Sequence, residues 1–255
     1  MPVDYGATIM RLTRGTWFRI SAIGAGALVL LSGTPLSGAA TGTPLTASQE
    51  LQAATAAANS EGSVRITVHF FSGHSTGELV QDTGLSTGVQ TVAIGKERIS
   101  IVLIKGVAYF SGNNQGLTKY FGLPQTLASR LSGRWISVTA ADSGYQSIIN
   151  GLTLSSAIKE VAPTGTIALG KRSKVNGQST VSVVGLASGG TTRITLFVAA
   201  SGKPLPVEAA SSGGTGTQKS GEIIAFSRWG EKVHVPRPTR TIPISSLKST
   251  GSSPG

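Results

Sequence analysis

The alternation of apolar and polar positions is clearest between residues 92 and 112. Gly95 and Lys96 supply a turn in this stretch, and Lys105 and Gly106 supply the next. Between the two turns the apolar positions fall at every second residue: Ile99, Ile101 and Leu103. That period of two is expected of a strand with one buried face. The pattern predicts consecutive antiparallel strands joined by tight turns.

The same alternation recurs on both sides of this meander. Residues 73–88 are polar and rich in glycine, and they predict only a weak strand around Leu79. Asn176 and Gly177 form the strongest hairpin signal in the chain. Other strands are predicted at 64–70, 135–138, 166–169, 179–186, 193–200, 205–210, 222–229 and 232–235. We therefore expect one curved antiparallel sheet, followed at 237–255 by a disordered tail rich in Pro, Ser and Thr.

Helical patterns are few and short. Thr46 and Gln49 have the spacing of a capping box, and Gly62 ends the helix that they begin. Further helices are predicted at 123–131, 143–150 and 153–161. These segments are too weakly amphipathic to be stable alone, so we expect them to lie against the sheet and give an α+β domain over 47–236.

The first 39 residues have the pattern of a signal peptide. Three arginines precede an apolar run at 20–31, and Ser37, Gly38 and Ala39 provide a small-residue cleavage site. Cleavage there would leave a linker at 40–46 before the domain. The alternative is an uncleaved membrane anchor, and translation starting at Met10 instead of Met1 would place the arginines at the N-terminus.

The charge of the chain favours anionic partners outside the cell. Residues 1–39 hold three of the 22 Lys and Arg and one of the 11 Asp and Glu, so the remainder retains a net charge near +9. Nucleic acid is not expected, because the basic residues are dispersed and no nucleic-acid motif is present. An anionic membrane surface or a cell-wall polymer is the expected partner, and a generally basic surface without a specific partner is the alternative. Neither a metal nor another cofactor is predicted, since the chain has no cysteine and only three scattered histidines.

Two segments carry a resemblance to a known family. The closing run IIAFSRWGEKVHVPRP, at 223–238, and the turn at Asn176, Gly177 and Gln178 are similar to the LppX/LprAFG family of mycobacterial envelope lipoproteins. The resemblance follows the element order from 47 to 236. It implies the half-barrel of the LolA and LolB carriers, in which a strongly curved antiparallel sheet holds short helices and an apolar cavity on its concave face. It also implies an acyl lipid or glycolipid as ligand and an envelope lipid transporter as a further partner.

One departure from the family concerns membrane attachment. The family's leader ends in a lipobox whose cysteine is acylated, whereas here two lipobox-like triplets are followed by Thr34 and Ala39. Neither side chain can form the thioether. The sequence therefore predicts a secreted envelope protein without a lipid anchor.

The cavity wall can be nominated from the alternation and from the helix positions. The nominated residues are Ile99, Ile101, Leu103, Val107, Tyr109, Leu127, Leu131, Ile149 and Ile158. The alternative is that these side chains fill a solid core. The protein would then act through its basic surface, on a cell-wall polymer for example.

Catalysis is not predicted. Residues 84–88 match G-x-S-x-G, but they precede a strand instead of a helix. Ser156 and Lys159 match S-x-x-K and residues 219–221 match K-[ST]-G, without the intervening S-x-N element. The carboxylates of Asp142, Glu160 and Glu208 show no pairing pattern and are expected on the surface.

Overall fold

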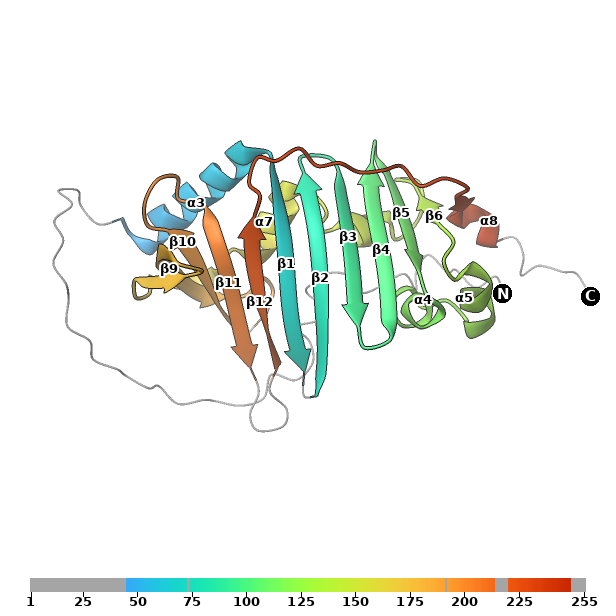
Figure 1. Cartoon of the computed structure of the whole chain (residues 1–255), viewed down its shortest axis with the longest axis horizontal. Coiled ribbons are helices and arrows are strands. Elements are labelled where there is room, and N and C mark those ends of the chain that lie inside the picture. The colour runs from blue at the N-terminus through green and yellow to red at the C-terminus, as the bar shows by residue number, and fades with distance from the viewer. Residues whose placement is uncertain (1–44, 73, 191, 214–219, 249–255) are drawn as a thin grey trace, which may run out of the picture.

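The computed structural model describes residues 45–72, 74–190, 192–213 and 220–248. These residues form one large sheet with a few short helices (Figure 1). The strands are β1 (Ser63–Ser72), β2 (Ser75–Gly84), β3 (Gly88–Ile94), β4 (Glu97–Ile104), β5 (Val107–Gly112), β6 (Ile136–Val138), β7 (Thr164–Leu169), β8 (Ser173–Val175), β9 (Gln178–Leu186), β10 (Arg193–Ala199), β11 (Pro206–Gly213), β12 (Ser220–Ser227) and β13 (Ile242–Pro243). The helices are α3 (Ala47–Glu61), α4 (Asn114–Phe121), α5 (Gln125–Leu131), α6 (Tyr145–Ile149), α7 (Leu154–Val161) and α8 (Ile244–Lys248).

The sheet is open and almost wholly antiparallel. Its strand order is β13-β6-β5-β4-β3-β2-β1-β12-β11-β10-β9-β7, with β8 paired to β9. Only β13 and β6 run parallel among the described pairs. Strand β1 pairs with both β2 and β12, so the two halves of the chain join at this strand. The predicted α+β class, a strongly curved antiparallel sheet with short helices on its concave face, is confirmed.

Strand register sets the side chains of the inner face in rows across the sheet. One row is apolar over β1, β2 and β3: Val68, Leu79 and Val92. The next row is apolar at its ends and polar in its middle. It contains Ile66, Gln81, Gln90, Ile101 and Phe110. All five of these side chains are buried. The core thus carries two buried amides at its centre, which require hydrogen-bond partners.

Helix α3 begins and ends as its sequence predicts. The Thr46 hydroxyl accepts a hydrogen bond from the Gln49 amide at 3.3 Å, while the Gln49 side chain accepts one from the Thr46 amide at 2.9 Å. Gly62 ends the helix in the left-handed region with φ of 76°. The helix buries Ala54 and Ala58 against the sheet.

The buried acid of α3 gives a pH prediction. Burial raises the pKa of the Glu50 carboxyl above its ordinary value, and the charge of Arg172 opposes this shift. The fold therefore favours the protonated acid, and this stabilisation is complete below the unfolded-state pKa of about 4.3 and lost as pH rises through the folded-state pKa. We expect Glu50→Gln to raise the melting temperature at neutral pH and to have no effect below about pH 4. A pH series of thermal melts checks this, and a lower melting temperature for the variant at neutral pH would contradict it.

Three local predictions differ from the structure. Strand β2 extends over 10 residues instead of forming a weak strand around Leu79, because pairing with β1 and β3 outweighs its poor strand propensity. Helix α4 was not predicted. Its N-cap is Asn113, whose side chain accepts a hydrogen bond from the Gly116 amide at 2.9 Å. The strand predicted at 232–235 does not form, and that segment passes over the ends of the strands without regular secondary structure (Figure 1).

The prediction of a disordered tail at 237–255 is wrong for residues 242–248. Strand β13 pairs with β6, and Ile244 at the start of α8 is only 2% exposed. This segment has few apolar residues, but those it has pack in or against the core. They are Ile242, Ile244 and Leu247. Residues 249–255, the predicted leader at 1–39 and residues 40–44 of the linker lie outside the described part. In the described ranges, no helix is long and apolar enough to cross a membrane.

Candidate functional site

The nine nominated side chains belong to packed regions of the protein. Six are buried: Ile99, Ile101, Leu103, Tyr109, Leu131 and Ile158. Leu127 and Ile149 are partly buried against the same core. The two-residue turn at 105–106 pairs Leu103 with Ala108, so Val107 and Tyr109 lie on the opposite face. The prediction that Val107 and Tyr109 share a wall with Ile101 is therefore wrong, because the turn reverses their parity.

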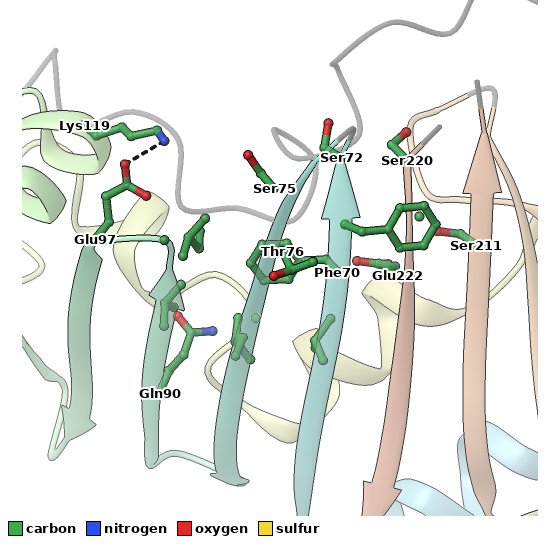
Figure 2. Close-up of a pocket in the computed structure, with 18 of the residues that line it drawn as sticks. Phe70, Ser72, Ser75, Thr76, Gln90, Glu97, Lys119, Ser211, Ser220 and Glu222 are labelled. Carbon is green, nitrogen blue, oxygen red and sulfur yellow. Dashed lines mark hydrogen bonds and ion pairs between the residues drawn. The ribbon is translucent and has the colours of Figure 1, made fainter. Parts of the chain in front are cut away.

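A cavity of about 900 Å³ lies beside this core, and none of the nine residues lines it. Its described lining comes from β1, β2 and β3, the paired ends of β11 and β12, α4, and the connection between α6 and α7 (Figure 2). The turn between β3 and β4, Glu97, Glu160 of α7 and Thr192 complete it. A role for the nine residues in lipid binding stays a prediction. The cavity is lined instead by residues of β2 and β3, among others.

The floor of the cavity is mostly apolar. The row Val68, Leu79 and Val92 forms its middle, Phe70 and Ile94 continue it toward the strand ends, and the amides of Gln81 and Gln90 line its inner end. Gly77 lies between Phe70 and Ile94 in register. A Cβ atom at position 77 would overlap the Phe70 ring, so glycine leaves the space in which this ring lies.

A buried hydrogen-bond network fixes one wall of the cavity. The Gln81 amide donates to the Gly151 carbonyl at 2.6 Å, and the Thr83 hydroxyl donates to the Leu152 carbonyl at 2.6 Å. Gln90 donates to the Gln81 side-chain oxygen at 2.8 Å. These bonds satisfy the buried amides and hold the α6–α7 connection over β2 and β3. Moving the connection away would leave buried polar groups without partners, at a cost of about 1–3 kcal/mol each.

The rim of the cavity is polar and charged. Figure 2 shows Ser72, Ser75 and Ser220 at the ends of their strands, and the ion pair between Lys119 and Glu97 to one side of them. The Lys119 ammonium is 2.9 Å from the Glu97 carboxylate. Glu222 lines the cavity from β12 and is buried. An apolar floor beneath a polar rim suits an amphiphile better than a wholly polar ligand.

Two of the three motifs with catalytic spacing lie wholly within the described residues. Ser86 lies exposed between β2 and β3, where a strand follows it. Ser156 is the third residue of α7, and its hydroxyl belongs to the capping box, 2.8 Å from the hydroxyl of the N-cap residue Thr153. Lys219 lies outside the described residues. Within the described ranges, no group of three His, Cys, Asp or Glu side chains could hold a metal ion.

Sequence reasoning missed the residues that line the cavity. The signal was present in β2 and β3, where Gln81 and Gln90 occupy inward positions flanked at alternate residues by Leu79 and Val92. Amide side chains at inward positions of a strand indicate a buried hydrogen-bond network. Such a network next to a row of apolar side chains indicates a cavity with both polar and apolar walls. The polar composition of residues 73–88 obscured this signal.

Comparisons with known proteins find similarity in structure only. No family model matches the sequence, and no curated protein matches it. The structure is similar to lipoprotein LppX of Mycobacterium tuberculosis, with 14% identity over 73% of this chain and 96% of that chain and a TM-score of 0.45. It is also similar to MucB, with 15% identity over 74% of this chain and 60% of MucB and a TM-score of 0.39. A chain of the MucA/MucB complex of Pseudomonas aeruginosa is similar as well. The match covers 55% of the matched chain, with 14% identity and a TM-score of 0.37. The chain thus spans under two thirds of the length of MucB, and the resemblance to LppX inferred from sequence reappears among the structural neighbours at low identity.

Proposed function

We propose that this protein is a non-catalytic extracytoplasmic binding protein that holds the acyl chain of a lipid or glycolipid. The observation that supports this proposal is the cavity of about 900 Å³ with an apolar floor in register across β1, β2 and β3. Small-molecule sites typically enclose about 300–1,000 Å³ and combine apolar walls with a few polar groups. The polar rim would then face the head group.

The energetics are sufficient for binding. Burial of a methylene group contributes about 0.8 kcal/mol, so ten buried methylenes contribute about 8 kcal/mol before the cost of association. A cavity that already exists requires no displacement of packed side chains. The hydrogen bonds of Gln81 and Thr83 hold the α6–α7 connection, one wall of this cavity, in place on β2.

Filling the cavity should abolish ligand binding without unfolding the protein. We expect Leu79→Trp, which adds volume to the cavity floor, to lose binding of a fluorescent fatty acid and to melt close to the parent. Ile101→Trp is the matched control, because Ile101 is 1% exposed and does not line the cavity. Overpacking at that site should cost about 1–3 kcal/mol or more.

The measurements are fatty-acid titration and thermal melting of the parent and both variants, with native mass spectrometry of protein purified from its own envelope. A bound lipid would appear as added mass. A parent that carries no lipid and does not bind the fluorescent fatty acid would refute the proposal. Equal ligand binding by parent and Leu79→Trp would place the ligand elsewhere.

A further inference from the structure

The segment at 232–241, here called the C-terminal strap, joins β12 to β13. Before it, the Gly230 amide donates to the Ser63 carbonyl at 3.1 Å, and the Ser63 hydroxyl donates to the Glu231 carbonyl at 2.6 Å. After it, the Ile242 amide donates to the Trp135 carbonyl at 2.9 Å, next to β6. Since β2, β3, β4 and β5 lie between β1 and β6, the strap runs across the ends of these four strands (Figure 1).

The strap presents one side to the protein and the rest to solvent. Its burial repeats every three residues from 234 onward, and the half-buried positions are Val235, Pro238 and Thr241. A three-residue repeat is that of a polyproline II segment, and Pro236 and Pro238 favour this geometry. The exposed positions with the same spacing are His234, Arg237 and Arg240. Arg240 adopts φ of 53° and turns the chain toward β13.

The exposed side of the strap carries cations without acids. Lys232, Arg237 and Arg240 are all exposed, and no Asp or Glu follows Glu231 in the sequence. None of these three side chains takes part in an ion pair within the described ranges. Lys105, in the turn between β4 and β5, is exposed at the same edge of the sheet. The strap edge is therefore a line of cations available to an external anion.

The same edge exposes a large apolar side chain. Leu85 lies in the connection between β2 and β3, whose strand ends the strap crosses, and it is 71% exposed. A linear polyanion offers no apolar environment in which this side chain could be buried. Cations beside a protruding apolar residue are the combination that binds the interface of an anionic bilayer.

We propose that this edge docks to an anionic phospholipid bilayer. The strap cations, Lys232, Arg237 and Arg240, contact the head groups, and Leu85 enters the interfacial layer. The cavity rim lies at the other end of the strands, at Ser72 and Ser75, whereas the strap lies by Ser63 and Gly84. Docking therefore leaves the cavity facing away from the bilayer and does not depend on ligand binding.

The test is co-sedimentation with vesicles made of equal parts phosphatidylglycerol and phosphatidylcholine, against vesicles of phosphatidylcholine alone. We expect binding to the anionic vesicles only, weakening as salt rises. A cation near such a surface contributes about fivefold to affinity, so Lys232→Gln, Arg237→Gln and Arg240→Gln together should weaken binding on the order of 100-fold. The matched control removes three exposed charges elsewhere, with Arg130→Gln, Lys159→Gln and Lys174→Gln, and should bind like the parent within a few-fold.

A second variant separates a bilayer from a soluble polyanion. We expect Leu85→Ala to weaken vesicle binding about tenfold and to leave heparin binding unchanged, because only the bilayer offers an apolar layer. Thermal melting and fatty-acid titration of the strap variant should match the parent, which separates this proposal from the ligand-binding function. Equal loss in the strap and control triples would overturn it in favour of net charge. An unaltered Leu85→Ala variant would overturn it in favour of a polyanion, and parental vesicle binding that is absent or insensitive to salt would overturn it outright.

Discussion

Truncation after Thr241 should lower the free energy of unfolding by about 3–5 kcal/mol relative to a chain truncated after Lys248. The segment removed contains β13 and α8, and its central side chain, Ile244, is 2% exposed. Loss of a buried isoleucine typically costs about 2–5 kcal/mol. The truncation also removes the hydrogen bond from the Ile242 amide to the Trp135 carbonyl. Urea unfolding of the two truncated chains measures the difference.

Point variants in the full chain provide the control for this prediction. Ile244→Ala should reproduce most of the loss, whereas Ser245→Ala should be neutral, because Ser245 is exposed in the same helix. Equal stability of the two truncated chains would show that β13 and α8 do not stabilise the fold.

Local rules were sufficient where neighbours in sequence are neighbours in space. The meander of β3, β4 and β5 depends on two tight turns. Its central strand buries Ile99, Ile101 and Leu103 on one face, as the alternation predicts, but Val102 on the other face is buried as well. The turn at Asn176 and Gly177 has both residues at positive φ, as the dipeptide predicts. The capping box of α3 is likewise formed within four residues.

Prediction was incomplete where distant partners decide the outcome. Strand β2 is polar, but it pairs on both sides, and its inward Gln81 is satisfied by the carbonyl of Gly151, 70 residues away. Ile244 is ordered because β6 is available to pair with the preceding strand. The cavity depends on where the α6–α7 connection lies over the sheet. No sequence pattern within that connection specifies its distance from the sheet. The alternation within β4 could therefore identify an inner face without showing which part of that face is covered by core and which by the cavity.

Gly88 sets the distance between the sheet and the α6–α7 connection, and Gly88→Ala should cost about 3–5 kcal/mol. A Cβ atom at this position would overlap the carbonyl oxygen of Leu152, which is backbone and cannot rotate away. Overpacking alone costs about 1–3 kcal/mol. Displacing the connection would also strain the hydrogen bonds that its carbonyls accept from Gln81 and Thr83, each worth about 1 kcal/mol. Urea unfolding measures the loss.

Gly84→Ala is the matched control for the Gly88 variant, because Gly84 lies at the same edge of the sheet and one residue from the partner of Gly88 in register. A Cβ atom at Gly84 would lie 3.2 Å from the Thr87 hydroxyl, which belongs to a side chain that can rotate. Replacement there should be nearly neutral, since the loss of backbone freedom in the unfolded chain offsets a small shift. At temperatures where Gly88→Ala is still folded, it should also bind the fluorescent fatty acid more weakly than Gly84→Ala, because the connection that it displaces is a wall of the cavity. Equal stability of the two variants would mean that the connection does not lie against β3 as described.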